Sequence, residues 1–213
     1  THLETLAILF SGITGLPAEI GLLTNLQWLA VEYGQLADVP PTIGQLSSLT
    51  YLGLSGQLLT SLPDEITMLH SLTYLQAPVN QLTSLPADIG NLTNLQNLLL
   101  QSNQIPELPS SFANLSALRE LDLSDNPLPG MLPVAITQLG SLELLTFTGA
   151  GLTGIPTEIS NLQNLRYLQL AFNNIPELPA SLAQLSALEQ LAVPNNELTE
   201  VPTWLGDMTG LRI

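Results

Sequence analysis

"IPELPSSFANLSALREL" runs from Ile105 to Leu121, and "IPELPASLAQLSALEQL" runs from Ile175 to Leu191. The two stretches are identical at twelve of seventeen positions and lie 70 residues apart. A catalytic site has no need of a second copy, whereas a structural unit that stacks on copies of itself does. The repetition therefore predicts a fold built from stacked units.

A unit of 23 residues accounts for this spacing and covers the chain. Each unit follows the pattern L-x-x-L-x-L-x-x-N-x-L-x-x-L-P-x-x-I-x-x-L-x-x, and the sixth has one extra residue within Asn126 to Pro133. Similar closing segments recur every third unit, which indicates duplication of a three-unit block. We expect residues 1–213 to form one domain of nine repeats, which start at Leu3, Leu26, Leu49, Leu72, Leu95, Leu118, Leu142, Leu165 and Leu188.

This pattern resembles that of leucine-rich-repeat proteins. Its LP-x-x-I-x-x-L half resembles the 23-residue subclass found in Ras-group and many bacterial leucine-rich-repeat proteins. The resemblance implies an α/β solenoid, a right-handed horseshoe with a parallel sheet on its concave face and short helical or 3-10 turns on its convex face. It implies a recognition task without naming the ligand, because such repeats serve many unrelated partners.

The residue pattern supports the same architecture on physical grounds. In L-x-x-L-x-L the side chains alternate inward and outward, which predicts a short strand. The following Pro suits the first position of a helix. An acidic residue two positions later is favourable because the helix dipole stabilises negative charge near the helix N-terminus. Such acids are Glu19, Glu65, Asp88 and Glu158. One unit cannot bury enough apolar surface to offset the ordering of its backbone, so the units must stack.

The ninth position of the unit is most often Asn, whose amide can both donate to and accept from the backbone of a turn. Asn80, Asn103, Asn126, Asn173 and Asn196 fit this role. We expect Ser11 and Gln57 to replace it in part, and Gly34 and Ala150 not to replace it.

Composition excludes several function classes. The chain has no Cys and no Lys, only three Arg, and a formal net charge of -15. This charge disfavours nucleic acid and anionic membrane surfaces, and no apolar run is long enough to insert into a bilayer. We find no nucleophile, phosphate-loop or metal-ligand motif, and we interpret His70 as an ordinary solvated side chain. The sequence thus predicts a protein that is not an enzyme and carries no cofactor or metal.

The informative residues are those that the repeat does not dictate. The third position of three consecutive units is occupied by Trp28, Tyr51 and Tyr74, although aromatic residues make up only 5% of the chain. Because neighbouring strands lie about 4.8 Å apart, these outward rings should form a continuous ladder. We expect the small Ala30 and Gly53 to leave room above the sheet beside the ladder.

Phe10 and Tyr33, at the eighth position, could extend this aromatic patch at one rim. Two interpretations of the patch compete. Cross-strand aromatic pairs stabilise sheets, whereas an exposed aromatic strip also forms a binding site.

A secondary acidic patch is expected further along the same face, at Glu120, Asp122, Asp125 and Glu143. A solvated face is the simplest interpretation. Recognition of a basic partner segment is a second, and calcium binding through carboxylate oxygens is a third.

The favoured function is that of a non-catalytic module that binds a protein or peptide, including one with basic segments, on the concave face. One alternative is a glycan or small polar ligand on the aromatic ladder, and another is a structural or assembly role. Neither end carries a capping sequence, which suggests a fragment of a longer chain or self-association through the ends. The absence of Lys and Cys, with a low pI, favours an extracellular or cell-surface location over a cytoplasmic one.

Overall fold

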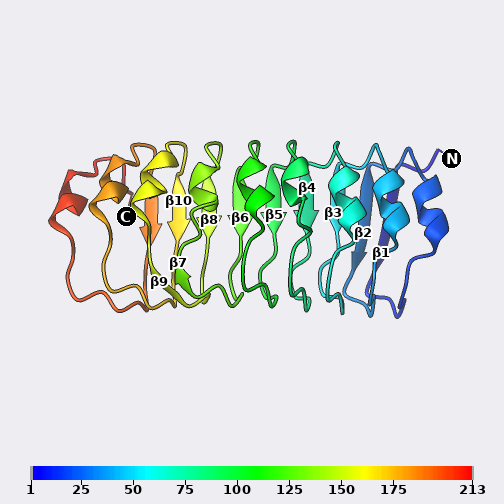
Figure 1. The fold of residues 1–213 in the computed structure, drawn as a ribbon, viewed down its shortest axis with the longest axis horizontal. Coiled ribbons are helices and arrows are strands. Elements are labelled where there is room, and N and C mark those ends of the chain that lie inside the picture. The colour runs from blue at the N-terminus through cyan, green and yellow to red at the C-terminus, as the bar shows by residue number, and fades with distance from the viewer. Residues whose placement is uncertain (1, 213) are drawn as a thin grey trace.

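A computed structural model describes residues 2–212 of the chain. Its main element is a parallel sheet in which nine strands lie side by side in chain order (Figure 1). The strands are β1 (Thr5–Leu9), β2 (Trp28–Glu32), β3 (Tyr51–Gly53), β4 (Tyr74–Gln76), β5 (Asn97–Leu99), β6 (Glu120–Asp122), β8 (Leu144–Thr146), β10 (Tyr167–Gln169) and β11 (Gln190–Ala192). Each unit of the repeat contributes one strand, so the α/β solenoid expected from the sequence is confirmed.

The strands pair in the register that the repeat predicts. Trp28 pairs with Tyr51, and Tyr51 with Tyr74, so the same position of successive units falls in one row across the sheet. The leucine that follows each of these positions points into the core. Leu52 and Leu75 are fully buried, as is Leu98 in the middle of the solenoid. Alternation along each strand therefore separates the core from one exposed surface of the sheet, which we call the strand face.

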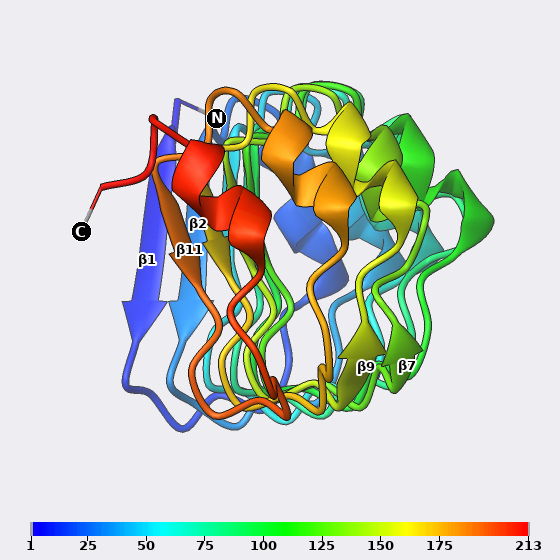
Figure 2. The ribbon, with the colours of Figure 1, turned by 90° about the vertical axis from the view of Figure 1, so that its left-hand side faces the viewer.

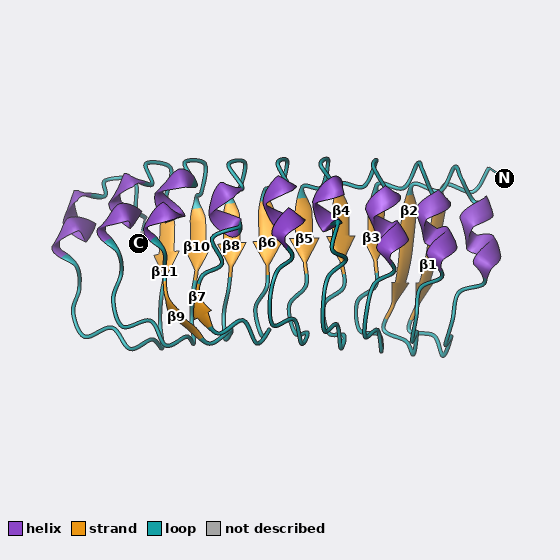
Figure 3. Ribbon diagram, in the orientation of Figure 1, coloured by secondary structure: helices purple, strands orange, loops and turns teal. Residues whose placement is uncertain are grey.

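Short 3-10 helices form the opposite side of the solenoid (Figures 2 and 3). They are η1 (Ala18–Leu22), η2 (Pro41–Gln45), η3 (Asp64–Met68), η4 (Ile89–Asn91), η5 (Ser110–Asn114), η6 (Ile136–Gln138), η7 (Thr157–Asn161), η8 (Ala180–Gln184) and η9 (Thr203–Asp207). In most units the consensus Pro stands one residue before the helix, as Pro63 does, and its carbonyl accepts the first hydrogen bond. Glu19, Glu65 and Glu158 lie in first turns, whereas Asp88 precedes its short helix.

The asparagines at the ninth position form a buried column that links consecutive units. In Asn126, Oδ1 accepts a hydrogen bond from the backbone N–H of Ile105 at 3.0 Å, and Nδ2 donates to the carbonyl of Leu100 at 2.9 Å. The same side chain also donates within its own unit, to Leu123 and Ser124. Asn80, Asn103, Asn173 and Asn196 make equivalent contacts, so the column satisfies backbone groups that would otherwise be buried without partners.

Gln57 replaces Asn in this column more completely than the sequence suggested. Its Oε1 accepts from the N–H of Leu36 at 2.8 Å, and its Nε2 donates to the carbonyl of Val31 at 2.9 Å. The longer side chain needs the space beside Gly34, where an added Cβ would lie only 2.7 Å from the Ser11 carbonyl and 3.1 Å from Gln57 Oε1. Gly34 therefore leaves room for both the Ser11 carbonyl and the Gln57 side chain, which approach it from the units on either side.

Ala150, as expected, supplies no side-chain contact to the column. The preceding unit is the one with the extra residue, and there the N–H of Leu128 donates to the carbonyl of Asn126 instead. The same unit contains β7 (Gly130–Met131), which pairs with β9 (Leu152–Gly154) in a second, two-stranded sheet. The extra residue thus changes the local backbone without changing the register of the main sheet.

The eighth position of every unit has a left-handed backbone, a feature that the sequence did not indicate. The φ angles range from 52° to 66° at Phe10, Tyr33, Gly56, Val79, Ser102, Asp125, Gly149, Phe172 and Asn195. Left-handed backbone costs a residue with a Cβ roughly 1–2 kcal/mol. Here the N–H at this position donates to a carbonyl of the next unit, as Val79 does to Gln101 at 3.0 Å. The hydrogen bonds of the solenoid therefore impose the conformation on Phe, Tyr and Val.

Candidate ligand-binding surface

The three aromatic residues at the third position form the expected ladder on the strand face. The ring centroids of Trp28 and Tyr51 lie 3.4 Å apart with an interplanar angle of 1°, and those of Tyr51 and Tyr74 lie 5.0 Å apart at 24°. Trp28 remains 42% exposed, and both tyrosines are half-buried. Tyr51 therefore has both ring faces covered, and Trp28 and Tyr74 each have one face covered by Tyr51.

The room expected above Ala30 and Gly53 is not empty. Both residues are buried, and the carboxylate of Glu32 occupies the space over Gly53. An added Cβ at Gly53 would collide with Glu32 Oε1 and would lie 3.0 Å from Tyr51 Cε1. The small residue thus admits a side chain of the protein itself, because Glu32 reaches across from the neighbouring strand.

Glu32 ties the ladder to the sheet through hydrogen bonds. Its Oε1 accepts from the hydroxyl of Tyr51 at 3.4 Å and from Nε2 of Gln76 at 2.6 Å. Burial and the negative charge of Glu32 raise the pKa of Tyr51 to about 12. Burial, followed by the charges of Glu120 and Glu32, also raises the pKa of Tyr74. Both hydroxyls therefore remain protonated donors at neutral pH.

A shallow groove of about 550 Å³ follows one side of the ladder. It is lined by Trp28, Thr50, Tyr51, Thr73 and Tyr74. The two threonines direct their hydroxyls to backbone carbonyls, Thr50 to Gln27 and Thr73 to Thr50. The groove therefore combines aromatic surface with threonine hydroxyls that already donate to the backbone, which suits a side chain with an aliphatic stem and a polar end.

Phe10 and Tyr33 stack on each other as a second aromatic pair, with ring centroids 4.9 Å apart and an interplanar angle of 9°. They are 77% and 51% exposed, and the ring of Tyr33 lies against Gly56. This pair sits at the far end of the strands, roughly 16 Å along the strand direction from the ladder row. Glu32 precedes Tyr33 in the chain, so its carboxylate lies between the two aromatic groups.

The four residues of the predicted acidic patch do not form one cluster. Glu120 accepts a hydrogen bond from Asn97, Asp122 accepts one from the N–H of Ser124, and Asp125 accepts one from the hydroxyl of Ser102. Glu143 lies beside Arg119 at the opposite edge of the strands from Asp125, on the order of 20 Å away by strand geometry. Glu120 lies in the same row as the ladder but two strands from Tyr74, with Asn97 between them.

Glu143 belongs instead to a row of alternating charges that we call the ionic ladder. All three arginines of the chain, Arg119, Arg166 and Arg212, occupy the second position of their units, and Glu143 and Glu189 occupy it in the units between them. Arg119 pairs with Glu143 at 2.7 Å, Nε of Arg166 donates to Glu189 at 2.7 Å, and Arg212 lies 3.4 Å from Glu189. Sequence reasoning missed this row, although the 23-residue period applied to the arginines alone would have revealed it.

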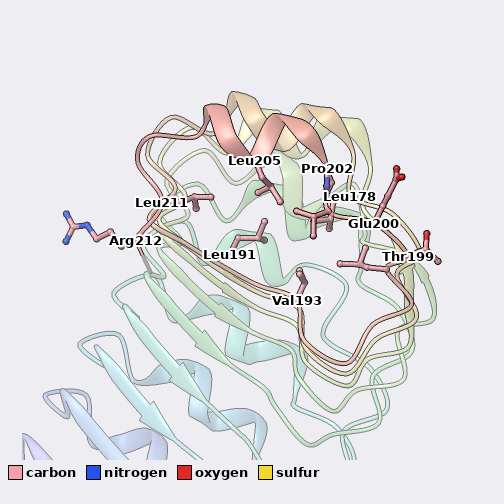
Figure 4. Close-up of a pocket in the computed structure, with 11 residues that line it drawn as sticks. Leu178, Leu191, Val193, Thr199, Glu200, Pro202, Leu205, Leu211 and Arg212 are labelled. Atoms are coloured by element: carbon pink, nitrogen blue, oxygen red, sulfur yellow. The ribbon is translucent and has the colours of Figure 1, made fainter.

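A cavity of about 530 Å³ opens at the C-terminal end of the solenoid (Figure 4). Its apolar lining includes Leu178, Leu191, Leu205 and Leu211. The leucines that precede these residues in the same repeat positions, such as Leu168, are fully buried within the solenoid. The cavity is therefore the exposed end of the hydrophobic core, and we do not assign it as a ligand site.

Two further features of residues 2–212 concern metal ions and membranes. No group of three or more His, Cys, Asp or Glu within this range is placed to hold a metal ion. The helices of this part of the chain are also too short and too polar to cross a membrane.

The comparisons with known proteins agree with this architecture. A family model described as a leucine-rich repeat region matches residues 64–150, and a second, described as Leucine Rich Repeat, matches residues 164–185. No curated protein gives a significant match to the sequence. Together the two models cover about half of the chain, and the chain belongs to the leucine-rich-repeat proteins.

Solved structures with the same fold come from bacteria and plants. A leucine-rich-repeat protein of Leptospira interrogans is 32% identical with a TM-score of 0.71, and the match covers 98% of this chain and 65% of that one. The Arabidopsis receptor kinase HAESA, in complex with the peptide hormone IDA and the co-receptor SERK1, is 28% identical with a TM-score of 0.84, covering 98% and 37%. An internalin of Listeria monocytogenes is 26% identical with a TM-score of 0.82, covering 93% and 56%. The chain thus spans between about a third and two thirds of these proteins.

Proposed function

We propose that this chain is a non-catalytic recognition module that binds a protein or peptide on the concave face of its sheet. The observation that carries the proposal is the stacked ladder of Trp28, Tyr51 and Tyr74 with the groove beside it. Core packing does not require these outward rings, and Trp and Tyr dominate the binding energy of many interfaces because they bury large areas at low entropic cost. Structures of similar fold include a receptor with a bound peptide hormone, which supports a peptide as the partner.

The stacked geometry favours a peptide over a glycan. A sugar binds an aromatic residue through the ring face, but the faces within the ladder are covered by neighbouring rings 3.4 and 5.0 Å away. Ring edges, the hydroxyl of Tyr74, the hydroxyl oxygen of Tyr51 as an acceptor, and the threonine side chains of the groove remain available. Such a surface suits the side chains of an extended peptide.

The test is a selection of random linear peptides displayed on phage, with the purified protein immobilised. Peptides that bind are then synthesised and measured by isothermal titration calorimetry. Tyr51→Ala should weaken binding by about 2 kcal/mol or more. Tyr167→Ala is the matched control, because Tyr167 occupies the same strand position far from the ladder. If no selected peptide loses affinity on Tyr51→Ala, the ladder only stabilises the sheet and the proposed function is wrong.

Display outside the cell is the location we propose for this module. The support is compositional, namely the absence of Lys and Cys with a sequence pI of about 4.1. Detection of the intact native protein by antibody on unpermeabilised cells would test this location, and a signal that requires lysis would contradict it.

A further inference from the structure

The C-terminal half of the strand face contains a complete arrangement of an aromatic ring, a cation and a carboxylate. The guanidinium carbon of Arg166 lies 5.3 Å from the ring centroid of Tyr167. The same guanidinium donates to Glu189 at 2.7 Å, and this hydrogen bond holds the pKa of Glu189 below its usual range. Tyr167 occupies the same strand position as the rings of the ladder, so the protein itself shows how a cation is accommodated on this face.

The N-terminal half has the ring and the carboxylate without the cation. Residues 1–118 contain eight acidic residues and neither Lys nor Arg. Within this half, Glu32 lies against Tyr51, and its Oε1 accepts the hydrogen bonds from both Tyr51 and Gln76. Among residues 2–212, no group donates a hydrogen bond to its second oxygen, Oε2. The site therefore has a carboxylate oxygen to offer, beside aromatic surface, in a region of uncompensated negative charge.

We propose that this site binds an arginine side chain of an extended peptide, which supplies the cation that Arg166 supplies in the other half. The peptide follows the groove, the aliphatic stem of the arginine crosses the ring edges, and its guanidinium pairs with Glu32. Long cationic side chains cover apolar surface with their stems while their heads remain polar. This proposal rests on the proposed function, because it names the chemistry of the peptide that the ladder binds.

Arginine fits the site better than lysine for two reasons. Its planar guanidinium stacks against aromatic rings and is more weakly hydrated than an ammonium group, so it loses less hydration free energy when it pairs with Glu32 beside the rings. Its several N–H donors can also reach Glu32 and the Tyr51 hydroxyl together, whereas an ammonium is a compact point charge. The carboxylate of Glu120, which contributes to the raised pKa of Tyr74, adds a second negative charge at the other end of the ladder.

The experiment uses the same phage selection, with counter-selection on the Tyr51→Ala variant. Peptides that depend on Tyr51 should be enriched in arginine. In a synthesised peptide, replacing that arginine by citrulline, which keeps the shape and removes the charge, should weaken binding at least tenfold. Glu32→Gln should weaken binding of the arginine peptide by a similar factor. Glu19→Gln, which removes the same charge from exposed η1 on the other side of the solenoid, should leave the affinity unchanged.

The outcomes separate this proposal from the proposed function. If Glu32→Gln weakens the arginine and citrulline peptides equally, Glu32 only positions Tyr51 and the arginine proposal is overturned. Peptides that depend on Tyr51 but lack arginine overturn it as well, while the proposed function stands. The absence of any peptide that depends on Tyr51 overturns both. Thermal unfolding of each variant, measured in parallel, distinguishes a lost contact from a lost fold.

Discussion

The N-terminal and C-terminal halves of the solenoid share a scaffold but use its free positions differently. Both place leucines in the same buried rows and both pair their strands in the same register. The N-terminal half stacks aromatic rings on the strand face and contains neither Lys nor Arg. The C-terminal half carries every arginine, each paired with a glutamate of a neighbouring unit. Positions that differ while the scaffold stays constant are the ones that carry function.

The largest effect is expected from breaking the scaffold that both halves share. Leu98 is fully buried in the middle of the solenoid, so Leu98→Ala should lower the free energy of unfolding by about 2–5 kcal/mol through lost burial and a cavity. Gln101, in the same unit, has a buried Oε1 without a hydrogen-bond partner among the described residues. Gln101→Ala breaks no hydrogen bond of this oxygen and should lower the free energy of unfolding by less than about 0.5 kcal/mol. Equal denaturant midpoints for the two variants would show that the repeat register is wrong.

The next largest loss of stability is expected from the asparagine column, which Gln57 represents in the N-terminal half and Asn126 in the C-terminal half. Asn126→Ala leaves the N–H of Ile105 and the carbonyl of Leu100 buried without their partner, which should cost about 2–4 kcal/mol. Gln57→Ala removes two hydrogen bonds where Asn126→Ala removes four, so it should cost roughly 1 kcal/mol less. Urea denaturation of both variants measures the difference. Asn91→Ala, at an exposed position, is the control, and a greater loss for Gln57→Ala than for Asn126→Ala would contradict the expected order.

The buried rows and the strand register could be predicted from the sequence because each depends on a pattern repeated within every unit. A leucine such as Leu52 or Leu98 must point inward wherever the strand alternates, whatever its neighbours are. The aromatic ladder followed from the same register, since Trp28, Tyr51 and Tyr74 occupy one row. Their exposure and stacking distances then came from the structure.

Features that depend on two different units could not be read from one unit's pattern. Gly34 has no side chain, and the space that a Cβ would fill there lies against both the Ser11 carbonyl of the preceding unit and the Gln57 side chain of the next. Glu32 covers Gly53 from the neighbouring strand. The small residue suggested open space above the sheet, but a side chain of the protein fills that space. The left-handed backbone at the eighth position could not be predicted for a similar reason. Phe, Tyr and Val disfavour that backbone, and hydrogen bonds from the next unit impose it.

That left-handed position offers a stabilising substitution in the N-terminal half. Val79 is β-branched, 57% exposed and has a φ of 55°, which is an unfavourable combination for valine. Val79→Asn should raise the free energy of unfolding by about 1 kcal/mol, because Asn tolerates this conformation. Val201→Asn is the matched control, since Val201 is 81% exposed and is not among the residues with positive φ. An equal change for the two variants would show that backbone strain is not the cause.

The smallest effect is expected from the ionic ladder of the C-terminal half. The hydrogen bond from Arg166 lowers the pKa of Glu189, so the pair contributes stability above the unfolded pKa of about 4.3, and this contribution is lost as the pH falls through the lower folded value. Glu189→Gln should therefore lower the melting temperature slightly at pH 7, and the difference from the wild type should shrink as the pH falls below the unfolded pKa and through the lower folded one. High salt should reduce it as well, because this ion pair is only partly buried and is therefore screened in part. Glu4→Gln, at the same repeat position in the N-terminal half, has no Lys or Arg in the neighbouring units and should show neither dependence. A Glu189→Gln difference that persists in acid would mean that the row is held by packing of the side-chain stems, and the charge contrast between the halves would then matter for binding alone.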